Sequence, residues 1–211
     1  MLRYHSIPVT SFQQNCSLLW CDQSNKAALI DPGGEATRLL EAVGQAGVTL
    51  EGILLTHGHL DHVGAASEIS ALTGNAITGP HIGDEPLLNA LQQQAEMFGL
   101  PSTEPFTPDR WLKDGEVVNV GSEPLQVIHA PGHSPGHVVF YHEPSQTAFV
   151  GDVLFRGSIG RSDLPGGDQH ALIQSIQSRL FPLGDDVTIV PGHGPRSTLG
   201  EERRSNPYVG A

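Results

Sequence analysis

Short apolar runs separated by polar turn residues fill the first third of the chain and predict β-strands. These runs are Leu2–Val9, Cys16–Cys21, Ala27–Asp31 and Gly52–Leu55. The last of them is continuously apolar, which is typical of a strand buried on both faces. Between the third and fourth runs, apolar residues recur at helical spacing and predict a helix over Glu35–Ala46, with Gly47 just after its end.

The rest of the chain repeats this alternation of strands and helices. Small apolar residues at helical spacing first predict a helix over Val63–Leu72. The later predicted strands are Glu116–Val120, Leu125–His129, His137–Tyr141, Thr147–Val150 and Val187–Val190, and the later predicted helices are Gln169–Phe181 and Leu199–Arg204. Two series of strands, each followed by a helix, predict an α/β fold in which two sheets pack face to face with helices outside.

The segment from residue 75 to residue 115 is less regular. Ile82–Met97 predicts a helix that is interrupted near Pro86. Pro101–Pro108 holds three prolines in eight residues and is expected to be a loop. We interpret this segment, and residues 80–113 in particular, as an insertion over the domain that is a candidate lid.

Length, charge and cysteine content limit the class of protein. The 211 residues suit a single domain over residues 1–211 and leave no room for two full ones. The net charge of −12 argues against a nucleic-acid partner, because such proteins normally carry the opposite sign. No membrane span and no signal peptide are apparent, so we expect a cytoplasmic protein that does not bind membranes. Cys16 and Cys21 form no CxxC motif and are expected to be reduced thiols.

A dense group of metal-ligating side chains follows the buried strand that ends at Leu55. The group consists of His57, His59, Asp61 and His62. Imidazoles and carboxylates together suit zinc, iron or manganese. A tight turn can aim the first two side chains one way and the last two another, and Gly58 is expected to let the backbone approach a metal closely. The stretch therefore predicts a metal site.

Three later segments share one format, in which a His or Asp stands on a glycine turn at the end of an apolar run. They are Pro131-Gly132-His133, Gly151-Asp152 and Pro191-Gly192-His193. Loops held at the ends of strands are where sheet proteins place convergent site residues. With these three, the candidate ligands number seven, which is too many for one four-coordinate zinc but suits two metals that share a carboxylate.

These motifs resemble the metallo-β-lactamase-fold hydrolases, and within them the glyoxalase II-like hydroxyacylglutathione hydrolases of the short, YcbL-type form. The supporting stretches are Ile30–Gly34, Leu55–Ala65, Ala130–His137, Gly151–Phe155 and Gly160–Asp163. The resemblance implies an αββα sandwich of two facing mixed sheets with external helices and two divalent metals at one edge. It assigns His57, His59 and His133 to one metal, Asp61, His62 and His193 to the other, and Asp152 to both.

The activity implied by the resemblance is hydrolysis of a small anionic thioester, with S-lactoylglutathione or a related hydroxyacylglutathione as the first candidate. Two divalent ions, zinc first and iron or manganese as alternatives, would lower the pKa of a shared water from 15.7 toward neutrality. The resulting hydroxide would attack the thioester carbonyl. Asp61 would hold a metal and also accept the proton of the attacking water. The thiolate can leave without a general acid, because its conjugate acid has a pKa of roughly 8.5–9.

Three further residues are weighed beside the ligands. Asp31 is either a turn former before Pro-Gly-Gly or a hydrogen-bond partner that orients a ligand histidine. Arg161 stands where the family offers a basic contact to glutathione. Glyoxalase II, however, binds glutathione with a separate C-terminal helical domain, and only 18 residues follow His193 here. The sequence therefore leaves open whether glutathione is the thiol of the substrate. His137 is expected to be structural.

Three other functions are compatible with these motifs. A mononuclear iron persulfide dioxygenase of the same fold would use His57, His133 and Asp152 and leave positions open for oxygen. A β-lactamase of the main zinc class would carry Cys in place of Asp152 and would be exported. A non-catalytic metal-binding protein would keep the fold without turnover, but all seven ligands are present here. The sequence pattern does not indicate an oligomeric state.

Overall fold

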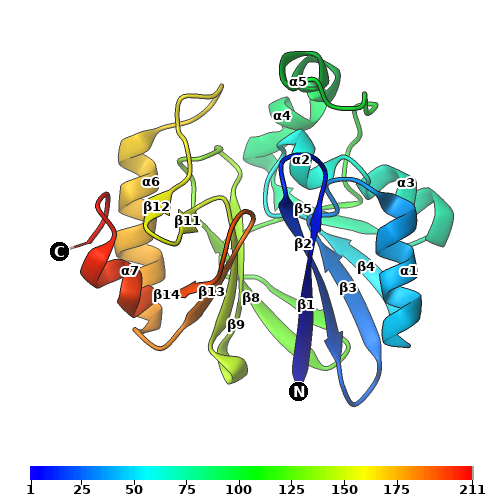
Figure 1. The fold of residues 1–211 in the computed structure, drawn as a ribbon, viewed down its shortest axis with the longest axis horizontal. Helices are drawn as coiled ribbons and strands as arrows, with labels where there is room; N and C mark the ends of the chain where they lie inside the picture. Colours follow the sequence, from blue (N-terminus) through cyan, green and yellow to red (C-terminus); the bar gives the residue numbers. More distant parts are fainter. Residues whose placement is uncertain (211) are drawn as a thin grey trace.

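Two six-stranded sheets pack face to face, and helices cover the outer side of each, in the computed structural model, which describes residues 1–210 (Figure 1). The first sheet has the strand order β1-β2-β3-β4-β5-β6. Its strands are β1 (Leu2–Val9), β2 (Gln14–Cys21), β3 (Lys26–Ile30), β4 (Thr49–Leu54), β5 (Ile77–His81) and β6 (Arg110–Leu112).

The second sheet has the order β14-β13-β10-β9-β8-β7, and a small two-stranded sheet joins β11 to β12. The strands are β7 (Val117–Val120), β8 (Glu123–His129), β9 (Val138–His142), β10 (Thr147–Gly151), β11 (Leu154–Phe155), β12 (Ser158–Ile159), β13 (Thr188–Pro191) and β14 (Ser197–Thr198). Both large sheets are mixed, since β3 to β6 run parallel in the first and β10 pairs parallel with β13 in the second.

Helices divide between the two outer faces and the top of the sandwich. They are α1 (Ala36–Ala46), α2 (Leu60–Val63), α3 (Ala66–Thr73), α4 (Glu85–Asn89), α5 (Leu91–Phe98), α6 (Gln169–Ser175) and α7 (Leu199–Ser205). Figure 1 shows α1 and α3 outside the first sheet, α6 and α7 outside the second, and α4 and α5 above the sheets. The predicted αββα sandwich of two mixed sheets is confirmed.

Each interface between layers is filled by apolar side chains. Leu19 and Leu54 of the first sheet pack with Phe140 and Phe149 of the second in the core between the sheets. Two further cores lie between each sheet and its own helices. Burying one such side chain contributes roughly 1.5–3 kcal/mol, so the three cores hold the strand ends in fixed positions.

The interpretation of residues 75–115 as an insertion is wrong for its two ends. Ile77–His81 forms β5 and Arg110–Leu112 forms β6, and both belong to the first sheet. The strands were not predicted because β5 contains Gly79 and Pro80, which normally oppose strand formation, and β6 is only three residues long. Only the segment between them, with α4 and α5, lies over the sheets.

The predicted helix Val63–Leu72 is also corrected. The chain forms a short helix α2 that starts at Leu60, and α3 follows after a break at Gly64 and Ala65. Two of the candidate ligands, Asp61 and His62, therefore lie on a helical turn rather than in a loop.

Two smaller predictions concern the cysteines and the membrane. Cys16 and Cys21 both lie on β2 and are free thiols, as expected. Among residues 1–210, no helix has the length and apolar character that crossing a bilayer requires.

Candidate metal centre

All seven candidate ligands lie at one edge of the sandwich, at or just after the ends of strands from both sheets. β4 leads into the turn that carries His57 and His59, and into α2. The other ligands follow β8, β10 and β13, which end near the same edge (Figure 1). Strands of two sheets thus contribute to one cluster, as the sequence predicts.

Three imidazole nitrogens form the first ligand group. His59 Nδ1 lies 2.9 Å from His133 Nε2, which lies 3.2 Å from His57 Nε2. The three rings meet edge to face, with ring centres 4.7–4.8 Å apart. One potential ligand atom from each residue lies within 4.8 Å of the other two, so all three can reach one ion.

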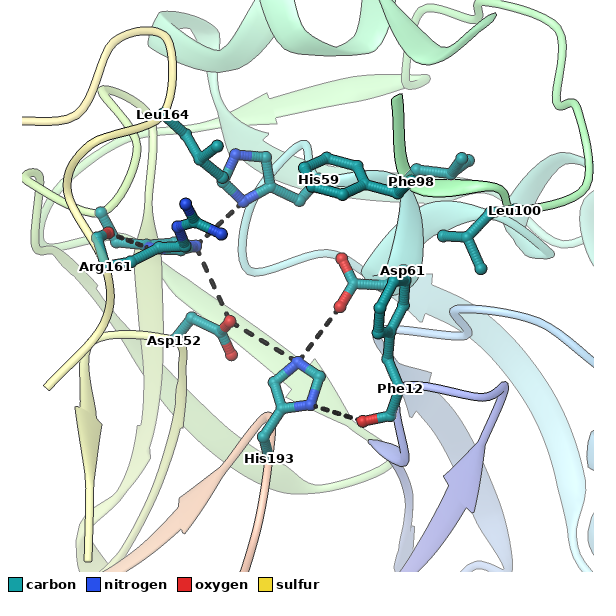
Figure 2. Close-up of a pocket in the computed structure, with 11 residues that line it drawn as sticks. Phe12, His59, Asp61, Phe98, Leu100, Asp152, Arg161, Leu164 and His193 are labelled. Atoms are coloured by element: carbon teal, nitrogen blue, oxygen red, sulfur yellow. Dashed lines mark hydrogen bonds and ion pairs between the residues drawn. The ribbon is translucent and has the colours of Figure 1, made fainter. Parts of the chain in front are cut away.

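The second ligand group joins a carboxylate to two imidazoles. Asp61 Oδ2 lies 3.1 Å from His193 Nε2 and 3.8 Å from His62 Nε2. Potential ligand atoms of these three residues again lie within 4.8 Å of one another. The other carboxylate oxygen of Asp61 points away from His193 in Figure 2.

Asp152 lies between the two groups and contacts both. Its Oδ2 lies 3.7 Å from His133 Nε2 in the first group and 3.6 Å from His193 Nε2 in the second. Its Oδ1 lies 3.3 Å from His62 Nε2. Figure 2 shows its carboxylate next to His193 on the floor of the cavity. This is the position that a carboxylate shared by two ions requires.

Hydrogen bonds outside the cluster fix which nitrogen of each ring faces inward. Four of the five ligand histidines direct Nδ1 to an oxygen atom. The pairs are His57 with Thr56 Oγ1 (3.0 Å), His62 with Asp31 Oδ2 (2.9 Å), His133 with the Arg161 carbonyl (2.7 Å) and His193 with the Phe12 carbonyl (3.1 Å). An Nδ1–H that donates outward leaves the Nε2 lone pair for the cluster, which is how proteins orient histidine ligands.

The donor set fits divalent metal ions. His62 Nε2 and Asp152 Oδ1 are buried and have no hydrogen-bond partner among the described residues. Burial lowers the pKa of His59 to about 3, and burial together with neighbouring histidines lowers the pKa of His57. These rings are therefore neutral, as metal ligands must be. Burial opposes ionisation of Asp152, but His62 beside it outweighs this and holds the carboxyl pKa well below its usual range.

Asp31 is the acceptor that orients His62. Its carboxylate is buried and accepts hydrogen bonds from Thr56 N (2.7 Å), Thr56 Oγ1 (2.6 Å) and His62 Nδ1. Because the Thr56 hydroxyl proton goes to Asp31, its oxygen is free to accept from His57 Nδ1. Asp31 thus reaches one histidine of each ligand group, which matches the orienting role predicted beside turn formation.

Asp84 is a buried acidic residue beside the candidate ligands that the sequence analysis missed. Its fully buried carboxylate accepts hydrogen bonds from Gly58 N (2.8 Å), from Ser134 Oγ (2.8 Å) and from Gly136 N (2.5 Å). Burial raises the pKa of Asp84 to about 6, although all three donors favour the ionised form. The carboxylate ties the turn that carries His57 and His59 to the loop that carries His133. No motif marks Asp84 in the sequence.

His137 lies directly behind the cluster without joining it. Its ring stacks on that of His57 with centres 4.6 Å apart, and its Nε2 accepts a hydrogen bond from Asp152 N at 3.0 Å. The ring belongs to none of the groups whose ligand atoms converge in residues 1–210. It packs against one ligand and positions the backbone of another.

Gly58 has a packing role that the sequence analysis did not predict. A Cβ atom there would lie 2.9 Å from Leu87 Cβ and 3.2 Å from the Asp84 carbonyl oxygen. Gly58 is therefore needed for close packing against the segment around α4, and its expected role in the approach to a metal stays a prediction. At Gly192, by contrast, a Cβ would lie 2.3 Å from Asp152 Oδ1, so this glycine does make room for a ligand.

An open cavity of about 230 Å³ lies over the two ligand groups (Figure 2). Its apolar walls are Phe12, Leu60, Phe98, Leu100 and Leu164. Arg161 lines the rim, where it was predicted to contact glutathione, but its guanidinium forms two 2.8 Å hydrogen bonds with the carboxylate of Asp163. Asp163, whose pKa Arg161 lowers to about 2, was not predicted as a partner.

Comparison with known proteins adds to this geometry. A family model described as the metallo-beta-lactamase superfamily matches residues 9–193. A Haemophilus influenzae protein named hydroxyacylglutathione hydrolase GloC is 50% identical over 204 residues, which are 96% of this chain and 96% of that protein. The alignment thus extends over nearly the full length of both.

Two solved structures are similar over nearly the full chain. The crystal structure of the B3 metallo-beta-lactamase BLEG-1 has a TM-score of 0.91 and 34% sequence identity, covering 99% of this chain and 100% of that one. TTHA1623, solved in a di-iron-bound form, has a TM-score of 0.88 and 40% identity, with 97% and 99% covered.

Proposed function

The chain belongs to the metallo-beta-lactamase superfamily and is a metal-dependent hydrolase, and from this premise we propose that it is a binuclear hydrolase of thioesters. The first candidate substrate is S-lactoylglutathione or a related hydroxyacylglutathione. The observation that carries the proposal is the position of Asp152 between two groups of three ligands, which provides for two ions rather than one.

Two of the compared proteins support the finer points of the proposal. The Haemophilus influenzae relative is named for hydroxyacylglutathione hydrolysis, which favours a glutathione thioester as substrate. The di-iron form of TTHA1623 favours two ions and makes iron a candidate beside zinc and manganese. Ligand sets of nitrogen and oxygen atoms take these metals according to supply.

The proposed assignment of ligands follows the two groups. His57, His59 and His133 would hold one ion, and Asp61, His62 and His193 would hold the other, with Asp152 shared by both. When bound, the two ions supply Lewis-acid chemistry, because they lower the pKa of water and polarise a carbonyl oxygen. Burial lowers the pKa of His57, His59 and His133, so these rings keep their neutral form. At His62 and His193 the carboxylates of Asp152 and Asp61 outweigh burial and raise the pKa, so binding of an ion there would release a proton.

Asp61 is proposed to move the proton. Its Oδ2 faces His193 and His62, so the second oxygen, Oδ1, is available to accept the proton of the attacking water. The apolar walls formed by Phe12, Phe98 and Leu164 reduce the local dielectric and strengthen charge interactions over the ligands. The thiolate leaves unaided, because a thiol has a pKa of roughly 8.5.

Hydrolysis by purified protein of known metal content tests the proposal. We expect S-D-lactoylglutathione to yield free glutathione with no oxygen uptake in the same cuvette. Oxygen uptake with a persulfide substrate and one iron per chain would instead establish the dioxygenase. Faster opening of a β-lactam than of any thioester would establish the activity for which BLEG-1 is named. A metal-loaded protein inactive on all three substrate classes would support the non-catalytic alternative.

A ligand substitution checks the metal assignment. His59→Ala removes one of three nitrogens from the first ligand group, so we expect bound metal to fall and turnover to drop by at least about a hundredfold. Removal of the metals with a chelator is expected to abolish the activity, and added zinc, iron or manganese to restore it. His170→Ala, on an exposed histidine of α6, is the matched control. Unchanged turnover in His59→Ala would refute the assignment.

A further inference from the structure

A second cleft opens beside the cavity over the ligands and continues it. Its volume is about 280 Å³, and it lies between the α4–α5 segment and the loop at Leu164–Gly166. The two spaces share His59, Phe98 and Leu164 as lining residues, so the cleft adjoins the cavity at the candidate ligand His59. Figure 2 shows Leu164 and Phe98 on either side of His59.

The lining of this cleft is almost entirely apolar. Its walls include Pro86, Leu87, Ala90, Met97, Pro135 and Pro165. Within residues 1–210, no Lys, Arg, Asp or Glu side chain lines it. Gln94, one of its few polar residues, uses its amide to bind Leu60 N, Gly58 O and Leu87 O. A charged group placed in this cleft would lose its hydration without gaining a partner.

A thioester has two arms, and their chemistry decides which one enters the cleft. The glutathione arm carries two carboxylates and an ammonium group, so it is excluded from an uncharged, apolar space. Arg161, the only Lys or Arg among the described residues that line either space, stands on the rim of the cavity. The charged thiol arm therefore belongs at that rim, and the cleft remains for the acyl arm.

We propose that this cleft, called the acyl cleft below, binds the acyl group of the substrate and selects apolar chains longer than lactoyl. The inference rests on the proposed thioesterase function and deepens it. The cleft is close to the lower limit of about 300 Å³ for a small-molecule site, which suits a chain of a few carbons rather than a bulky group. Met97 is mostly exposed at its mouth and gains burial when such a chain binds.

The test varies the acyl arm while the thiol stays constant. Wild-type protein is expected to hydrolyse S-hexanoylglutathione with a kcat/KM at least about tenfold above that of S-lactoylglutathione, because each buried methylene adds to the stabilisation. Calorimetry with the non-hydrolysable thioethers S-hexylglutathione and S-methylglutathione gives a second readout. The hexyl compound is expected to bind at least about tenfold more tightly.

Two variants locate the chain in the cleft. Ala90→Trp fills the space, and Met97→Asp places a charge at its mouth, so both are expected to bring the hexanoyl-to-lactoyl ratio and the hexyl-to-methyl ratio close to one. Asn89→Trp, an exposed neighbour that does not line the cleft, adds the same bulk elsewhere and is expected to keep both ratios. A folded Met97→Asp protein keeps the test valid if Ala90→Trp fails to fold.

The outcomes separate this inference from the proposed function. The acyl cleft would be overturned if the hexanoyl-to-lactoyl and hexyl-to-methyl ratios were close to one in the wild-type protein. It would also be overturned if both ratios stayed high in the two cleft variants. Either result would hold even if S-lactoylglutathione is hydrolysed. If no thioester is hydrolysed, the proposed function is wrong, and the thioether titrations alone decide whether the cleft binds an alkyl chain.

Discussion

The geometry of the candidate metal centre depends on side chains and backbone atoms that belong to neither of the two proposed ligand sets. Thr56, Asp31 and the carbonyls of Phe12 and Arg161 hold the Nδ1 atoms of four ligand histidines. These partners set which nitrogen faces the cluster before any metal binds. Outer partners of this kind typically change metal affinity by about 10- to 100-fold when removed.

Asp84 offers the sharpest test at this scale. In Asp84→Asn an NH₂ group replaces one carboxylate oxygen. This group is a hydrogen-bond donor, and it would face another donor, which is the N–H of Gly58 or Gly136 or the hydroxyl of Ser134. We expect the metal-free protein to lose about 2–4 kcal/mol of unfolding free energy. Zinc affinity, measured by competition with a chelator, is expected to fall by about tenfold or more, because the turn with His57 and the loop with His133 are no longer tied together.

Ser134→Ala is the matched comparison, since it removes one donor and leaves the carboxylate bound to two backbone N–H groups. Ser134→Ala is expected to lower the unfolding free energy of the metal-free protein by only about 1 kcal/mol. Loss of stability in Asp84→Asn with unchanged zinc affinity would reduce Asp84 to a purely structural residue.

At the residue scale, the candidate ligands and one support, Asp31, could be picked out from the sequence, and Asp84 could not. His57, His59, Asp61 and His62 stand together in the sequence, and the other ligands share a glycine-turn format that marks strand ends. Asp84 is 26 residues from Gly58 and 50 from Ser134, in a segment without a motif. Its role depends on a tertiary contact that no local pattern encodes.

At the scale of elements, strand ends and the helical turn α2 carry the candidate ligands, and α4 supplies a surface on which the turn with His57 and His59 rests. Gly58 packs against Leu87 of α4, and Gln94 of α5 binds the carbonyl of Gly58 and the amide of Leu60. The helices predicted as a lid thus also support the metal centre from outside. The strands that flank them, β5 and β6, fix where this support begins and ends.

A double-mutant cycle measures this contact. Gly58→Ala forces a methyl group to within 2.9 Å of Leu87 Cβ and is expected to cost about 1–3 kcal/mol in urea unfolding. Leu87→Gly alone is expected to cost about 3–5 kcal/mol, because the buried side chain is lost and glycine weakens the helix. Together they should cost at least about 1 kcal/mol less than the sum, since removal of the Leu87 Cβ makes room for the added methyl group.

Gly44→Ala provides the control for this cycle. Gly44 lies within α1, and a Cβ there would meet nothing within 4 Å. The substitution is expected to stabilise the protein by about 0.5–1 kcal/mol through helix propensity alone. Additive costs for Gly58→Ala and Leu87→Gly would show that the turn does not rest on α4.

The predictability of elements follows their regularity. The strand β1 and the helix α1 were predicted nearly to their ends, because polar turn residues bound β1 and the apolar residues of α1 keep helical spacing. The helix expected over Val63–Leu72 was misplaced because Gly64 and Ala65 interrupt it while the apolar pattern continues. The segment β5 was not predicted as a strand because it contains Gly79 and Pro80, which lie at an irregularity between the pairs that Thr78 and His81 form with β6.

At the scale of the whole molecule, a net charge of −12 surrounds a site proposed for an anionic thioester. The charge of the distant carboxylates repels the substrate during approach, and salt screens this repulsion over a Debye length of about 10 Å at 0.1 M. The ions proposed for the cluster add local positive charge. The carboxylates of Asp61 and Asp152 lie within the same cluster, 3–4 Å from ligand histidines, so at longer range their negative charge offsets much of the positive charge of the ions. Long-range repulsion should therefore control the approach of the substrate.

The dependence of kcat/KM on ionic strength tests this balance. For S-lactoylglutathione we expect kcat/KM to rise by about threefold between 10 mM and 300 mM NaCl, because screening removes repulsion between like charges. An uncharged thioester, S-acetyl-N-acetylcysteamine, shares the reacting group and should show no such rise. A kcat/KM that falls with salt for the anionic substrate alone would mean that the local positive field at the metal centre, with Arg161 at its rim, dominates the approach instead.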